Sequence, residues 1–75
     1  MIRVIGLSDK MYDHITKVYD NVIAYENSDC NCIEFCEFSY ISTFDDHIEI
    51  RIADFEDNMV SICFALNDFW RIEIE

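Results

Sequence analysis

The chain has 75 residues, 52% of them hydrophobic, and carries sixteen acidic against five basic residues, for a formal net charge of −11. Its length fits one domain, 1–75, and its hydrophobic content is too high for a disordered acidic tail. The charge argues against direct binding to nucleic acid or to an anionic membrane, because both interactions need Lys and Arg. We therefore expect a single small acidic domain that contacts neither nucleic acid nor membrane directly.

The N-terminal residues lack the continuous apolar run of a secretory signal peptide, since the chain becomes polar at Ser8. We therefore expect a cytoplasmic protein of a bacterial host, where thiols stay reduced. Its four cysteines are then not a disulfide framework: Cys30, Cys32, Cys36 and Cys63.

The first elements in chain order are a short strand and a long helix. Residues 2–7, IRVIGL, are a candidate fifth strand at the edge of the sheet. Ser8 is a suitable N-cap, and from there to about Tyr25 the apolar residues recur at helical spacing. This pattern predicts an amphipathic helix that lies on the core and ends at a loop over 26–29.

Hydrophobic residues then alternate with polar ones, a period typical of antiparallel strands with one solvent-exposed face. The first such strand spans about 32–40 and needs a β-bulge near Cys36-Glu37 to bring its apolar side chains to one face. The other three are centred on 48–52, 60–66 and 70–74. The predicted fold is α+β: one amphipathic helix packed on a four- or five-stranded antiparallel sheet, a β-α-β-β-β-β meander.

Loop length decides which side chains face each other across these hairpins, because directly opposed residues share a face. A three-residue loop over 56–58 would pair apolar residues across the first hairpin: Ile52 with Ile62, Ile50 with Phe64 and Ile48 with Leu66. A loop over 67–69 would do the same across the second hairpin: Leu66 with Trp70, Phe64 with Ile72 and Ile62 with Ile74.

The cysteines raise the question of a metal site, because structural zinc takes four thiolate or imidazole ligands. Alternation places Cys63 on the exposed face of its strand and Cys36 on the core face of an unbulged strand. The four thiols then cannot surround one ion. We expect them to be small apolar residues, with no metal and no cofactor bound.

Catalytic motifs are absent from the sequence, which has neither a glycine-rich phosphate loop nor a nucleophile elbow. Its two histidines are expected in structural positions, His14 at the edge of the helix's apolar face and His47 at the start of a strand. A chain this short has little room for a cavity beside its core. We expect a binding protein rather than an enzyme.

The acids are segregated from the bases. No Lys or Arg occurs from Val18 to Ile50, a stretch that holds eight acids: Asp20, Glu26, Asp29, Glu34, Glu37, Asp45, Asp46 and Glu49. We expect an uncompensated acidic surface here that binds a basic partner. The expected contact residues are seven of these acids and one aromatic anchor: Glu26, Asp29, Glu34, Glu37, Tyr40, Asp45, Asp46 and Glu49.

The function that this pattern favours is that of a small acidic inhibitor, which blocks the basic nucleic-acid-binding site of a target by DNA or RNA charge mimicry. A phage or mobile-element anti-defence protein fits best. In size and acidity the chain resembles anti-CRISPR proteins, a resemblance of composition that covers no motif. It implies a basic nucleic-acid-binding protein or a ribonucleoprotein effector as the partner.

Two other classes fit the same composition. An immunity protein or antitoxin that neutralises a basic nuclease toxin would present the same acidic surface and bind fast and salt-sensitively. A homo-oligomeric structural module would instead use its acids only for solubility. It would form a homodimer through an exposed strand edge that carries Trp70 and Tyr40.

Overall fold

The computed structural model describes residues 1–19, 22–26, 30–35, 39–53 and 58–75, which hold one helix and seven strands. In chain order the elements are β1 (Ile2–Leu7), α1 (Asp9–Val18), β2 (Val22–Glu26), β3 (Asn31–Phe35), β4 (Tyr40–Thr43), β5 (His47–Ala53), β6 (Met59–Ala65) and β7 (Arg71–Ile74). The predicted α+β class is confirmed.

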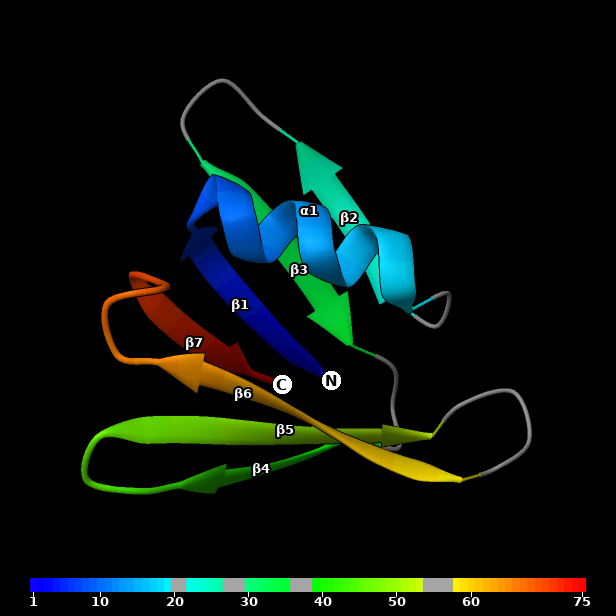
Figure 1. Cartoon of the computed structure of the whole chain (residues 1–75), viewed down its shortest axis with the longest axis vertical. Helices are drawn as coiled ribbons and strands as arrows, with labels where there is room; N and C mark the ends of the chain where they lie inside the picture. The colour runs from blue at the N-terminus through cyan, green and yellow to red at the C-terminus, as the bar shows by residue number, and fades with distance from the viewer. Residues whose placement is uncertain (20–21, 27–29, 36–38, 54–57) are drawn as a thin grey trace.

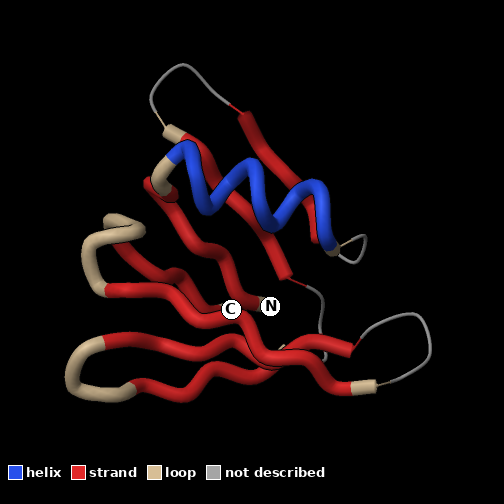
Figure 2. The backbone as a smooth tube through the Cα atoms, in the orientation of Figure 1, coloured by secondary structure: helices blue, strands red, loops and turns tan. Residues whose placement is uncertain are grey.

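The strands form two antiparallel sheets, not the single sheet that the sequence predicts. A four-stranded sheet has the order β2-β3-β1-β7, and a three-stranded sheet has the order β4-β5-β6. Figure 1 shows α1 crossing β2 and β3 on one face of the four-stranded sheet, with the three-stranded sheet at the opposite end of the molecule. The chain passes between the sheets twice, from β3 to β4 and from β6 to β7 (Figure 2).

One hydrophobic core joins both sheets and the helix. Its buried members come from β1, α1, β3, β5 and β6: Ile2, Val4, Leu7, Ile15, Ile33, Phe35, Ile48, Ile50, Ile52, Ile62 and Phe64. Phe35 and Phe64 meet edge to face across the two sheets, with ring centroids 6.4 Å apart. Because each sheet buries one face in this core, the opposite face of each is left to the polar side chains.

The helix begins where the sequence predicts and ends earlier. The Ser8 hydroxyl accepts a hydrogen bond from the Met11 backbone N–H at 3.4 Å, and Tyr19 ends the helix in an extended conformation. Residues 22–25, predicted as the last helical turn, and Glu26, predicted as the start of a loop, instead form β2, paired with β3. Val22 and Ile23 are β-branched and suit a pleated strand, and a short apolar run fits either period. Pairing with β3 decides between them.

Two predictions about the first strands are wrong. β1 is not an edge strand, because it lies between β3 and β7. The predicted strand over 32–40 is divided: β3 ends at Phe35 in one sheet and β4 begins at Tyr40 in the other. The predicted bulge at Cys36-Glu37 lies outside the described residues.

The hairpin of β5 and β6 has the predicted faces but not the predicted pairs. The observed partners are Ile48 with Phe64, Ile50 with Ile62 and Ile52 with Val60. Each partner lies two residues away from the predicted one, because the connection is longer than a loop over 56–58. Since strand side chains alternate with period two, a shift of two residues keeps every side chain on its face.

The last strand does not pair with β6 as predicted. β7 pairs with β1 instead, placing Ile72 opposite Val4 and Ile74 opposite Ile2. Leu66 and Trp70, predicted to pair across that hairpin, are both exposed. An alternating strand can satisfy its apolar face against any partner with a matching pattern, and β1 provides one.

Candidate partner-binding surface

The turn between β4 and β5 displays two acids. It is closed by a hydrogen bond from the Phe44 backbone N–H to the His47 carbonyl oxygen at 2.9 Å. Asp45 and Asp46 at its tip are exposed, and the Asp46 side chain is 89% exposed. In the part of the chain that the structure describes, neither carboxylate forms an ion pair with a Lys or Arg.

His47 organises this turn. Its ring stacks on Phe44 with centroids 4.5 Å apart and planes 9° from parallel. Its Nδ1 lies 2.7 Å from the Asp46 carboxylate, and its Nε2 lies 3.6 Å from the Glu49 carboxylate. The hydrogen bond with Asp46 raises the pKa of His47 and lowers the pKa of Asp46. The charge of the turn therefore depends on the protonation of one imidazole.

Glu49 lies next to Cys63 on the exposed face of the three-stranded sheet. The two residues are cross-strand partners, and the Cys63 Sγ lies 3.7 Å from a Glu49 carboxylate oxygen. Partial desolvation, and then the negative charge of Glu49, raise the pKa of the Cys63 thiol. A thiol held protonated is a poor nucleophile, so this Cys-Glu-His arrangement does not favour covalent catalysis.

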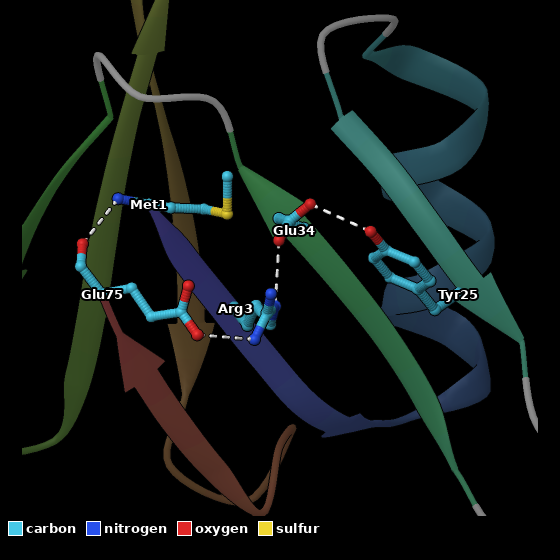
Figure 3. Close-up of polar contacts among 5 residues, drawn as sticks. All are labelled: Met1, Arg3, Tyr25, Glu34 and Glu75. Atoms are coloured by element: carbon cyan, nitrogen blue, oxygen red, sulfur yellow. Dashed lines mark hydrogen bonds and ion pairs between the residues drawn. The ribbon is translucent and has the colours of Figure 1, made fainter.

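Glu34 departs from the expectation of an exposed, uncompensated acid. It is only 5% exposed and lies on the face of the four-stranded sheet opposite α1 (Figure 3). One carboxylate oxygen accepts from Arg3 Nε at 2.9 Å, and the other accepts from the Tyr25 hydroxyl at 3.0 Å. This last hydrogen bond raises the pKa of the Tyr25 phenol. Glu34 is therefore a structural acid.

The same arginine ties the chain ends together. Arg3 Nη1 binds the Glu75 carboxylate at 3.0 Å, and the Met1 ammonium donates to the Glu75 carbonyl oxygen at 3.0 Å (Figure 3). Counting charges along the sequence could not reveal this compensation, because Arg3 lies 31 positions from Glu34. Only the pairing of β1 with β3 places the two residues side by side.

The remaining predicted contact residues are spread over the molecule. Glu26 is the last residue of β2, where its backbone pairs with Asn31. Tyr40 is exposed at the start of β4, opposite Arg51 and therefore beside a base. Asp29 and Glu37 lie outside the described residues. The structure thus brings together Asp45, Asp46 and Glu49, and separates them from Glu34.

The cysteines occupy different sheets. Cys32 is buried on β3 and Cys63 is exposed on β6, as alternation predicts for Cys63, while Cys36 lies outside the described residues. Among the described side chains, no group of three or more His, Cys, Asp or Glu could hold a metal ion. Within the same residues, no helix has the length and apolar character needed to cross a membrane.

Three exposed apolar residues are not among the eight predicted contact residues: Phe44, Leu66 and Trp70. Leu66 and Trp70 are exposed because β7 pairs in the four-stranded sheet and not with β6, and no local sequence pattern predicts that choice.

Neither a family model, nor a curated protein sequence, nor a solved structure matches this chain. Function must therefore be argued from the site itself.

Proposed function

We propose that this chain is a small acidic inhibitor that occupies the basic nucleic-acid-binding surface of a partner protein by charge mimicry. The observation that carries the proposal is a net charge of −11 combined with the two exposed carboxylates at the β4–β5 turn. Glu49, a quarter exposed on the adjoining strand, adds a third carboxylate to the same region.

Charge distribution supports this assignment. Among the described residues, Arg3 is the one Lys or Arg in an ion pair, and it faces Glu34 and Glu75 on the four-stranded sheet. The turn acids have no Lys or Arg partner among the described residues, and only His47, when it is protonated, offsets the charge of Asp46. Proteins that bind nucleic acid present Lys and Arg groups spaced for phosphates, and such a surface attracts a rigid group of carboxylates.

The kind of partner that fits is a nuclease or a ribonucleoprotein effector whose function depends on that basic surface. In an RNA-guided nuclease, the groups that read the short duplex motif or line the heteroduplex channel are of this kind. The corresponding biological role is that of a phage or mobile-element anti-defence protein, such as an anti-CRISPR.

Affinity capture tests the proposal. The immobilised protein is exposed to bacterial lysate, and bound proteins are released by steps of NaCl with or without duplex DNA as competitor. We expect basic nucleic-acid-binding proteins to be captured, and to be released both by salt and by the competitor. Proteins whose retention ignores both treatments would contradict charge mimicry.

A pair of charge reversals locates the contact. Asp45→Lys should weaken capture about tenfold or more, because it places a like charge opposite the partner's bases. Asp13→Lys makes the same change in net charge on the exposed side of α1 and should weaken capture far less. Equal losses in the two variants would mean that total charge, and not the turn, directs binding.

A further inference from the structure

Trp70, the only tryptophan in the sequence, lies at the surface. Its side chain is 67% exposed, more than any other large hydrophobic residue that the structure describes. The Trp70 backbone N–H donates a hydrogen bond to the Ile5 carbonyl oxygen at 2.9 Å, which attaches the Trp70 backbone to β1. Trp70 lies in the bend just before β7 (Arg71–Ile74). A large aromatic residue that is already held in place at the surface loses little conformational entropy when it is buried in a complex.

Gly6 shapes the seat of this side chain. It is the only glycine of the chain and has a φ of +75° within the β-bulge of β1. A Cβ placed on Gly6 would lie 2.2 Å from the Trp70 ring, so the indole rests directly against the glycine backbone. Because Gly6 has no side chain, one side of the indole packs on the backbone of β1 while the rest of the ring stays exposed to solvent.

Two more exposed apolar side chains lie at the same end of the molecule. Leu66, 52% exposed, begins the turn that leads to Trp70, and Phe44, 49% exposed, lies in the β4–β5 turn. The two turns are neighbours because His47 pairs with Ala65 at the adjoining ends of β5 and β6 (Figure 1). We call Phe44, Leu66 and Trp70 the end patch.

The charges around the end patch favour a basic protein over a second copy of this chain as the binding partner. Asp45 and Asp46 border it on the β4–β5 turn, while Asp68 lies in the other turn, where its carboxylate accepts from the Ala65 N–H. Two exposed bases lie at the same end: Arg71 follows Trp70 in the sequence, and Lys10 lies in the first turn of α1, where the Ser8 N–H donates to the Asp68 carbonyl oxygen. Acids are in excess, so a second copy of a chain with net charge −11 would meet like charge, whereas a basic protein would meet complementary charge.

We propose that the end patch is the apolar anchor of the partner interface, and that it docks onto an apolar spot bordered by Lys or Arg on the basic protein partner. The inference rests on the proposed function, because the acids of the same end supply the attraction. The acids increase the association rate and its dependence on salt, while the end patch slows dissociation by excluding water.

The experiment compares four immobilised proteins in the same lysate by quantitative mass spectrometry: the unaltered chain, Trp70→Ala, Asp45→Lys and Ile74→Ala. Ile74 is a similarly exposed apolar residue, 64% against 67% for Trp70, at the far end of β7, and it serves as the matched control. Thermal unfolding of each variant first establishes that it is folded. A captured protein is then purified and its dissociation rate measured against each variant.

Retention that falls roughly 30-fold with Trp70→Ala through faster dissociation, and is unchanged with Ile74→Ala, supports the end patch. The fluorescence emission of Trp70 should also shift to shorter wavelength when the purified partner binds. A partner lost with Asp45→Lys but kept with Trp70→Ala would overturn the end patch and leave the proposed function standing. A partner lost with Trp70→Ala but indifferent to salt would overturn the proposed function.

Self-association is the remaining outcome. A blue shift of Trp70 emission that grows with the concentration of the protein alone, together with dimers in analytical ultracentrifugation, would assign the end patch to a second copy. That result would overturn the inference of a basic partner. Monomers at every concentration tested are expected, because the acids of two facing patches repel each other.

Discussion

Carboxylates of this chain have two different roles that depend on what surrounds them. Glu34 is enclosed by Arg3 and Tyr25 and holds strands β1, β2 and β3 together across the open face of the sheet. Asp46 is exposed, and its one ion pair among the described residues is with His47, its neighbour in the sequence. A buried acid that loses its partners is costly, whereas an exposed pair contributes little.

Removal of the Glu34 carboxylate should therefore destabilise the protein. Glu34→Ala removes the acceptor of Arg3 Nε and of the Tyr25 hydroxyl, while Arg3 Nη1 keeps Glu75. It should lower the free energy of unfolding by about 1–3 kcal/mol, measured by urea denaturation. Glu75→Ala removes the other, exposed acceptor of Arg3 and should have a much smaller effect. Similar losses of unfolding free energy in the two variants would show that the contribution of Glu34 to stability does not depend on its burial.

His47 should titrate above its ordinary pKa of 6.5, because the Asp46 carboxylate accepts a hydrogen bond from the protonated ring. The folded-state pKa is the higher one, so the stability that this pair adds is fully present below about pH 6.5. It is lost as the pH rises through the folded-state pKa. Asp46→Asn should bring the NMR titration midpoint of His47 down, and an unchanged midpoint would contradict this pairing.

Elements of this fold are positioned by single irregularities. Gly6 forms the bulge of β1, where the register changes between Ile5 opposite Cys32 and Leu7 opposite Asn31. The bulge turns Leu7 into the core together with Val4 and brings the chain to the start of α1. One glycine therefore controls both the direction in which β1 leads into the helix and the seat of Trp70.

Gly6→Ala should destabilise the protein through two causes that can be separated. A positive φ costs a non-glycine residue roughly 1–2 kcal/mol, and the new methyl group also collides with the Trp70 ring. In a double-mutant cycle, Trp70→Ala removes the collision with the ring but keeps the Cβ of residue 70, which would lie 2.7 Å from the new methyl group. Gly6→Ala should therefore cost less, but still a measurable amount, in that background. Equal costs in both backgrounds, by thermal or urea unfolding, would show that the indole does not rest on Gly6.

The whole molecule concentrates a net charge of −11 within principal extents of 33 × 27 × 23 Å. Acids on one side therefore lie within reach of acids on another at low salt, when the Debye length is about 30 Å at 0.01 M, but much less so at about 10 Å in 0.1 M salt. Self-repulsion of this kind opposes the compact state.

Salt should accordingly stabilise the free protein while it weakens the complex. The midpoint of thermal unfolding is expected to rise by several degrees between about 0.01 M and 0.1 M NaCl, and equally in KCl if screening is the cause. A falling midpoint would mean that attractive pairs such as Arg3–Glu34 outweigh the repulsion.

Several features of the candidate site were accessible from the sequence. The segregation of acids from bases marks eight acids, of which Asp45, Asp46 and Glu49 lie together at the start of β5. Glu34 could not be recognised as a compensated acid, because its partner comes from a strand distant in sequence. The end patch was equally inaccessible, since the exposure of Leu66 and Trp70 depends on which sheet β7 joins.

By itself the sequence determined the features that depend on neighbouring residues. These are the start of α1 at its Ser8 cap and the buried faces of β5 and β6, because capping and alternation act over a few positions. Tertiary structure alone decided that Val22–Glu26 is a strand, that β1 is central and that the strands divide into two sheets. The reason is that several pairings satisfy the same alternation, and only the packing of all elements around one core selects among them.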